Sequence, residues 1–185
     1  MKIYYSASND VDPKTKEFYK NTVDFLQNEG FEVVHCLLLD GGKKKLKSEG
    51  EFSNIYNNVL KRIDEAEVFF ADISSPSGGV GYQISHAVYQ RKPIIVTYLE
   101  SKESNPSVII RGIKSKNVMI VNYKSSEDLF KKLPPILNEA LKMVKVRFNL
   151  VMPNDYYSFI ERASKEAKMS KTEYVLSLIK GEKDK

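Results

Sequence analysis

The feature that most constrains the fold is a repeated alternation of strand-length apolar runs with longer amphipathic segments over residues 1–142. In the longer segments, apolar residues recur every three or four positions, as they do on one face of a helix. This alternation favours a parallel sheet covered by helices on both faces, with ligands bound beyond the carboxyl ends of the strands. We therefore expect an α/β fold with a Rossmann-like or flavodoxin-like sheet of five parallel strands. The expected strands are 3–6, 31–39, 67–73, 93–98 and 118–121, and the expected helices are 12–30, 52–63, 82–91 and 126–143.

The last part of the chain follows a different pattern. Apolar residues at 144, 146, 148 and 150 alternate with polar residues at 145, 147 and 149, which is typical of a half-buried strand. A helix is expected from Pro153-Asn154, and Ser170 to Glu173 forms a capping box that opens a second helix. Because one strand and two short helices cannot bury a core alone, this segment should dimerise. We predict two domains, 1–142 and 144–185.

Charge and cysteine content set further limits. The formal net charge is +5, which is too small by itself to indicate a nucleic-acid partner. However, residues 144–185 hold nine basic and six acidic residues, so the excess is concentrated in the smaller domain. The single cysteine, Cys36, excludes a disulfide within the chain and a thiolate metal cluster. No apolar run reaches the length of a membrane span. We expect a cytoplasmic protein without cofactor, metal ion or membrane partner.

A serine- and glycine-rich loop, 74–81, lies between an expected strand and an expected helix. Glycine allows the backbone to approach a ligand closely, and free amides at a helix N-terminus favour a phosphate group. The loop therefore predicts an anion-binding site. The alternative is a plain glycine-rich turn without a ligand.

Three segments in the same order resemble one family. Residues 74–87, which read SSPSGGVGYQISHA, resemble the signature loop of the nucleoside 2-deoxyribosyltransferase superfamily, and most of all its 2′-deoxynucleoside 5′-monophosphate N-hydrolase branch. Residues 2–8 are similar to the opening strand and loop of that family, and residues 107–112 to a later motif. The resemblance covers about residues 1–140. It implies a nucleoside 5′-monophosphate or a related small molecule as the ligand.

The resemblance also implies roles for individual residues. It assigns 5′-phosphate contacts to Ser8, Ser77, Gly79 and Ser107, with Gly81 in the same loop, and a place in the sugar and base pocket to Tyr4. In the family, the serine at the position of Ser107 reaches the site of a neighbouring subunit, which implies a homodimer or higher homo-oligomer. Without the resemblance, Ser8 and Ser107 would be interpreted as ordinary loop serines.

The two catalytic positions of the family differ in this chain. The glutamate nucleophile is replaced by Gln83, and the acid/base aspartate by Val59, or by Asn58 if the alignment slips by one residue. A carboxylate can attack the anomeric carbon or stabilise an oxocarbenium ion, whereas a carboxamide does neither well. Asp64 and Asp72 lie nearby in sequence but do not fit the family position. We therefore expect a domain that binds a nucleotide without cleaving it, a pseudoenzyme.

The tail, residues 144–181, resembles a ribbon-helix-helix module. In that family two chains pair their strands into an antiparallel ribbon that enters the major groove of DNA. The resemblance places Lys145, Arg147 and Asn149 on the DNA-facing side, where they could contact base edges. The amides of Ser170, Lys171 and Thr172 could hold a DNA phosphate. The alternative is a dimerisation element with a solvated outer face.

Three hypotheses for function remain open at this point. The first is a DNA-binding transcriptional regulator in which a catalytically silent domain senses a nucleotide. The second is an active N-glycosidase or nucleoside deoxyribosyltransferase whose tail serves for oligomerisation. The third is a DNA-binding repressor whose α/β domain is a dimerisation scaffold with an empty pocket.

Overall fold

The computed structural model describes residues 1–35, 48–100, 107–145 and 149–184. The chain forms two compact units, Met1–Lys145 and Val146–Lys185, and each is described here by itself. Cys36, Arg147 and the end of the strand predicted at 31–39 lie outside the described residues.

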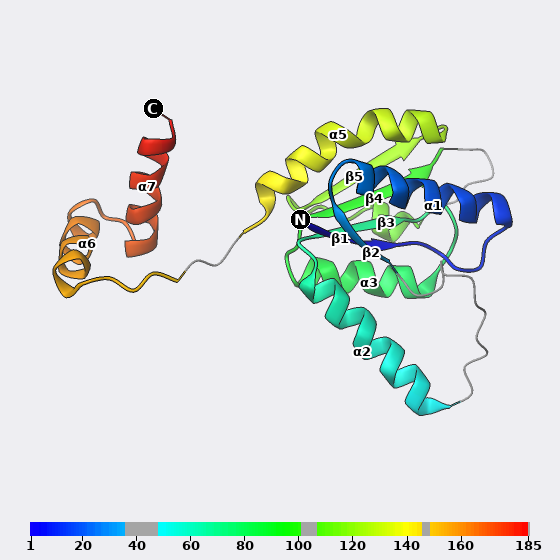
Figure 1. Ribbon diagram of the computed structural model, residues 1–185, viewed down its shortest axis with the longest axis horizontal. Helices are drawn as coiled ribbons and strands as arrows, with labels where there is room; N and C mark the ends of the chain where they lie inside the picture. Colours follow the sequence, from blue (N-terminus) through cyan, green and yellow to red (C-terminus); the bar gives the residue numbers. More distant parts are fainter. Residues whose placement is uncertain (36–47, 101–106, 146–148, 185) are drawn as a thin grey trace. The chain divides into compact units, whose positions relative to one another are not determined.

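The first unit is built on a parallel sheet of five strands, as the sequence predicted (Figure 1). The strands are β1 (Lys2–Ser6), β2 (Glu32–His35), β3 (Val68–Asp72), β4 (Ile94–Leu99) and β5 (Val118–Tyr123). Their order across the sheet is β2-β1-β3-β4-β5. The direction of the strand order therefore reverses between β1 and β3. Ligands of such sheets bind beside this reversal, outside the carboxyl ends of the strands.

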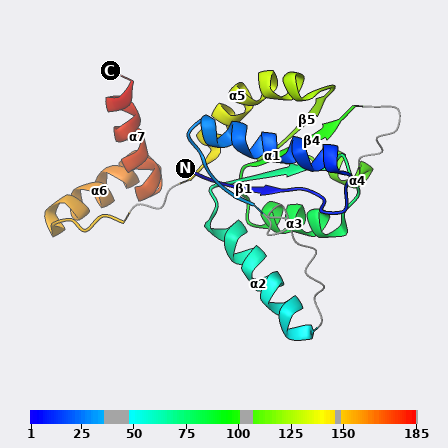
Figure 2. The ribbon, with the colours of Figure 1, turned by 45° about the vertical axis from the view of Figure 1, so that its right-hand side comes forward.

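Helices cover both faces of the sheet, as Figures 1 and 2 show. The helices α1 (Pro13–Asn28) and α5 (Ser126–Met143) lie on one face, and α2 (Glu49–Glu65) and α3 (Gly78–Tyr89) on the other. Because side chains alternate along a strand, each face has its own core. Tyr5 and Phe70 belong to the core under α1 and α5, while Tyr4 and Phe69 belong to the core under α2 and α3.

Side-chain caps set the starts of several helices, among them α1, α3 and α5. The carboxylate Oδ1 of Asp12 accepts hydrogen bonds from the amides of Lys14 (2.9 Å) and Thr15 (3.1 Å), which opens α1. Ser77 and Ser125 cap α3 and α5 in the same way. The helix predicted at 82–91 begins at Gly78 instead, because the hydroxyl of Ser77 caps it and the glycine-rich segment forms its first turn.

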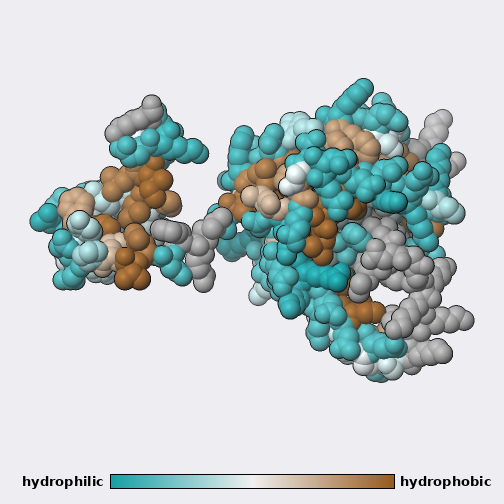
Figure 3. Space-filling model, viewed as in Figure 1, coloured by the Kyte–Doolittle hydropathy of each residue, from teal (hydrophilic) through white to brown (hydrophobic). Residues whose placement is uncertain are grey.

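The second unit consists of α6 (Asn154–Glu166) and α7 (Lys171–Lys183). The rings of Phe159 and Tyr174 meet at a centroid distance of 6.5 Å, and Ser170 and Glu173 form the predicted capping box. Large apolar side chains remain exposed on this unit (Figure 3). They include those of Leu150, Val151, Tyr156, Phe159, Leu176, Leu178 and Ile179.

The strand predicted at 144–150 is not formed in its described residues. Val144 ends α5 and packs partly against the core of the first unit, Lys145 follows it, and Asn149 and Leu150 belong to no strand. Residues 146–148 lie outside the described residues. The backbone N–H and C=O groups of a ribbon strand pair with those of a second chain, so they have no such partner in a single chain.

Candidate functional site

The N-terminus of α3 presents free backbone amides beside the carboxyl ends of the strands. The hydroxyl of Ser77 accepts a hydrogen bond from the amide of Val80 at 3.3 Å, and Gly78 and Gly79 form the first turn. The first amides of a helix have no partner within it and carry partial positive charge. A Cβ atom added at Gly79 would meet only the hydroxyl of Ser77, at 3.8 Å. The packing of the chain therefore leaves open space beside this amide, as an anion-binding loop requires.

A buried carboxyl group holds this loop to the sheet. One oxygen of Asp72 (Oδ1) accepts a hydrogen bond from the amide of Ser74 at 3.0 Å. The other (Oδ2) accepts from the hydroxyls of Thr97 and Tyr123, both at 2.9 Å. The hydroxyl of Ser74 in turn accepts from the amide of Leu99 at 2.8 Å. Burial raises the pKa of Asp72. The sequence showed no role for Asp72 because its partners lie far along the chain.

The raised pKa of Asp72 predicts how stability changes with pH. Its folded-state pKa lies above the unfolded value of about 3.9. The stabilisation that this group contributes is therefore complete below about pH 4 and is lost as pH rises through the folded pKa. We expect the free energy of unfolding of the wild type, relative to that of Asp72→Asn, to fall above pH 4 in denaturant titrations. An exposed control, Asp10→Asn, should show no such trend, and a wild-type advantage that grows with pH would contradict the prediction.

Three of the predicted phosphate-binding serines lie around this loop. Ser8 is buried, and its hydroxyl donates to the carbonyl oxygen of Pro76 at 3.3 Å. Ser107 caps the short helix α4 (Val108–Arg111) and lines, together with Ser77, a cavity of about 210 Å³. The structure thus brings Ser77 and Ser107 of one chain together. The reach of Ser107 into a second subunit stays a prediction.

An apolar pocket of about 280 Å³ lies next to the loop, between α2 and α3. The rings of Tyr56 and Tyr82 are 5.9 Å apart, and their hydroxyl oxygens are 2.8 Å apart. The residues that line the pocket are Phe52, Ile55, Tyr56, Val59 and Leu60 of α2 and Gly79, Tyr82 and Gln83 of α3. Its surface suits a flat, weakly polar group such as a nucleobase.

Gln83 and Val59, which the sequence resemblance places at the catalytic positions of the family, both line this pocket. Gln83 is buried, and its side-chain oxygen accepts a hydrogen bond from the hydroxyl of Ser6 at 2.8 Å. No carboxylate is among the described residues that line this pocket.

Tyr4 and Gly81 lie away from the walls of these cavities. Tyr4 is fully buried and stacks against Phe69 at a centroid distance of 5.7 Å. Its place in the middle of β1 directs it under α2 and α3, so it belongs to the core of that face, and its role in a sugar and base pocket stays a prediction. Gly81 lies within α3, where an added Cβ atom would meet nothing within 4 Å.

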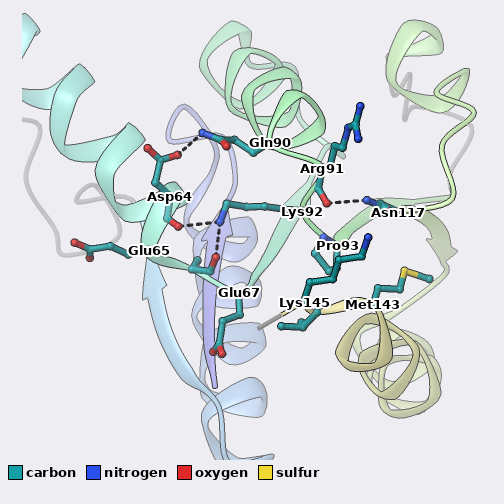
Figure 4. Close-up of a pocket in the computed structure, with 12 residues that line it drawn as sticks. Asp64, Glu65, Glu67, Gln90, Arg91, Lys92, Pro93, Asn117, Met143 and Lys145 are labelled. Carbon is teal, nitrogen blue, oxygen red and sulfur yellow. Dashed lines mark hydrogen bonds between the residues drawn. The ribbon is translucent and has the colours of Figure 1, made fainter. Parts of the chain in front are cut away.

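A larger cavity, of about 580 Å³, lies at the opposite end of the strands (Figure 4). Glu67 and Pro93 precede β3 and β4, so this cavity is at the amino ends of the strands. The ammonium group of Lys92 donates to the carbonyl oxygens of Asp64 (2.9 Å) and Ala66 (2.7 Å), and partial burial lowers its pKa. Two backbone carbonyl groups thus satisfy the partly buried ammonium group of Lys92, and we interpret this cavity as structural. Lys145, predicted to contact DNA, lines this cavity of the first unit.

The other residues predicted to contact DNA lie outside the described residues, are exposed, or already have partners within the chain. Arg147 lies outside the described residues, and Asn149 and Thr172 are exposed. The amide of Ser170 already donates to the carboxylate of Glu173 at 2.8 Å, so a DNA phosphate would compete for it. The ammonium group of Lys171 lies 3.3 Å from the carboxylate of Glu161 and over the ring of Tyr157. The hydrogen bond that Lys171 donates to the hydroxyl of Tyr157, and then the one to the carboxylate of Glu161, raise the pKa of Lys171.

No group of three or more His, Cys, Asp and Glu side chains could hold a metal ion within the described ranges. In the same part of the chain, no helix is long and apolar enough to cross a membrane.

Sequence comparisons with known proteins identify the family of the chain. No protein-family model matches the chain. A relative from Syntrophotalea carbinolica, named "Putative 2'-deoxynucleoside 5'-phosphate N-hydrolase 1", is 30% identical over 146 residues, which span 76% of this chain and 94% of the relative. The chain belongs to the 2′-deoxynucleoside 5′-phosphate N-hydrolase family. A family member of the same name from Thermofilum pendens is 28% identical over 77% of this chain and 99% of its own. The 5-hydroxymethyl-dUMP N-hydrolase of Branchiostoma floridae is 32% identical over 51% of this chain and 86% of its own.

Two solved structures share the fold of the first unit. The Clostridium botulinum CMP N-glycosidase BcmB superposes with a TM-score of 0.55 and 21% identity, over 72% of this chain and 98% of its own. The 2-deoxyribosyltransferase of Bacillus psychrosaccharolyticus gives a TM-score of 0.52 and 15% identity, over 70% of this chain and 90% of its own. At these identities the likeness shows the shared α/β architecture.

Proposed function

We propose that this chain binds a nucleoside 5′-monophosphate and acts on its N-glycosidic bond, the reaction for which its relatives are named. The observation that carries the proposal is the site at the start of α3. There Ser77 lies beside the free backbone amides at the start of α3, with Ser8 and Ser107 nearby. The apolar pocket, whose surface suits a base, lies next to these groups. A phosphate would be held by the amides and hydroxyls, and the base would lie between α2 and α3.

A specific observation favours a second candidate, binding without cleavage. The pocket presents Gln83 and Val59 at the two positions where the family has carboxylates. A neutral amide held by Ser6 cannot form a glycosyl ester, and valine cannot donate a proton to a leaving base. Under the first candidate, hydrolysis therefore proceeds by attack of water, with no carboxylate nucleophile from these positions.

Base release from nucleoside 5′-monophosphates separates the two candidates. The protein is incubated with ribo- and deoxyribonucleoside 5′-monophosphates, and free base is quantified by chromatography. Release that grows with protein concentration and disappears in Ser77→Ala supports hydrolysis. Saturable binding without release supports the second candidate. Neither binding nor release would contradict both.

Ser77→Ala is expected to weaken nucleotide binding by about tenfold to a hundredfold. A hydrogen bond to a charged group contributes about 1.5–3 kcal/mol, and about 1.4 kcal/mol corresponds to a factor of ten in affinity. The matched control is Ser125→Ala, because Ser125 caps α5 with the same hydroxyl-to-amide distance of 3.3 Å. Both variants should lose similar stability, about 1 kcal/mol, while calorimetric titration should show weaker binding in Ser77→Ala alone. Equal affinities in the two variants would contradict the assignment of Ser77.

For the second unit we propose pairing with a second copy and contact with DNA. The exposed apolar side chains of Val151, Phe159 and Ile179 support a partner. The ribbon-helix-helix pattern and the excess of basic residues in 144–185 support DNA as the ligand. The residues proposed for this contact are Lys145, Arg147, Asn149, Ser170, Lys171 and Thr172.

A further inference from the structure

The side-chain amide of Gln83 is held in one orientation. The hydroxyl of Ser6 donates to its oxygen at 2.8 Å, and both residues are buried. Ser6 is the last residue of β1 and Gln83 lies in α3, so the hydrogen bond joins two rigid elements. The nitrogen Nε2 of Gln83 donates to no partner among the described residues, and the side chain lines the apolar pocket. The amide therefore offers two N–H groups to a ligand.

The place of Gln83 between two subsites determines which part of a nucleotide it meets. Gly79 and Gln83 are four residues apart on one face of α3, and both line the pocket. A phosphate on the amides near Gly79 and a base in the apolar pocket that Tyr56 and Tyr82 line would put the sugar over Gln83. This step rests on the function proposed above.

The stereochemistry of the sugar determines which of its groups would lie next to Gln83. In a β-nucleotide the base projects from one face of the ring, and the 2′-hydroxyl of ribose projects from the opposite face. A side chain that approaches the anomeric carbon on the side away from the base therefore lies next to the 2′ position. A carboxylate there could attack the carbon, whereas the amide of Gln83 can only donate or accept a hydrogen bond.

We propose that Nε2 of Gln83 donates a hydrogen bond to the 2′-hydroxyl, so that this site prefers ribonucleoside 5′-monophosphates over their 2′-deoxy counterparts. The relatives are named for 2′-deoxynucleotides, so the preference would set this chain apart from them. A site that hydrogen-bonds a hydroxyl group disfavours the analogue without it, because the buried amide then stays unpaired.

The test compares matched pairs of ligands that differ only at the 2′ position. Affinities of AMP and dAMP, CMP and dCMP, GMP and dGMP, and UMP and dUMP are measured by calorimetry with the full chain. We expect the wild type to bind the ribonucleotide of its preferred pair about tenfold or more tightly than the deoxynucleotide. Gln83→Met keeps the length of the side chain and removes the donor. It should bring the ratio to about one, by weakening ribonucleotide binding and by removing the unpaired amide that disfavours the deoxynucleotide.

Ser6→Ala provides an independent variant should Gln83→Met not fold. Without the hydroxyl of Ser6 the amide can rotate, so the ratio should fall between those of the wild type and Gln83→Met. Equal wild-type affinities for both sugars, or a preference that survives both substitutions, would overturn the proposal for Gln83 alone. Failure of every nucleotide to bind would instead contradict the proposed function on which it rests.

Discussion

Replacing Gln83 by glutamate and Val59 by aspartate together should raise base release from 2′-deoxynucleoside 5′-monophosphates by about a hundredfold or more over the wild type. Both side chains line the apolar pocket, so the double variant would put two carboxyl groups there. A carboxylate at residue 83 can attack the anomeric carbon, and general acid catalysis contributes about 10²–10⁴-fold. The surroundings of residue 59, among them Ile55 and Leu60, would raise the pKa of an aspartate there, as a proton donor requires.

The matched control for the double variant combines Val59→Asp with Gln83→Met, which keeps the new acid and leaves the nucleophile out. It should stay well below the rate of the double variant. Rates are measured by chromatography of free base at saturating substrate, with thermal unfolding as a check on folding. A wild type that already releases base as fast as the double variant would show that Gln83 and Val59 do not limit catalysis. That result would remove the case for the second candidate, binding without cleavage.

Arg147→Ala should weaken the binding of duplex DNA by about tenfold or more in low salt. A dimer would lose two contacts at once, and a guanidinium group that contacts a base or a phosphate contributes about 1–3 kcal/mol. Binding is measured by fluorescence anisotropy with a mixed-sequence duplex at several salt concentrations, since phosphate contacts make affinity fall as salt rises.

Lys124→Ala, which removes an exposed cation of the first unit, is the control for the DNA experiment. It has the same change in net charge and should leave DNA affinity nearly unchanged. An equal effect of both variants would indicate nonspecific attraction to a basic protein. No measurable affinity of the wild type in low salt would contradict a DNA role and leave the tail as a dimerisation element.

The sheet could be predicted from the sequence because buried parallel strands are continuous apolar runs. Residues 67–73 and 93–98 became β3 and β4 with changes of one residue at their ends. The start of α3 was predicted four residues late, since glycines at 78, 79 and 81 weaken a helical pattern. The cap formed by Ser77 was the signal that would have found it.

Local sequence patterns could not predict contacts between residues that lie far apart along the chain. Asp72 meets Thr97 and Tyr123, which lie 25 and 51 residues away, and Ser6 lies 77 residues from Gln83. The sequence therefore indicated which residue types occupy the site but not how Asp72 holds the loop or how Ser6 orients the amide. The strand predicted at 144–150 is not formed in its described residues. Under the proposal that two copies pair, its partner would lie on the second chain.

A structure of the protein soaked with a nucleoside 5′-monophosphate would test the central claim most directly. We expect phosphate density on the amides at the start of α3, within hydrogen-bond distance of the hydroxyl of Ser77, and a base between α2 and α3. The sugar should lie over Gln83. A nucleotide bound instead in the cavity around Lys92, or no nucleotide at millimolar concentration, would contradict it.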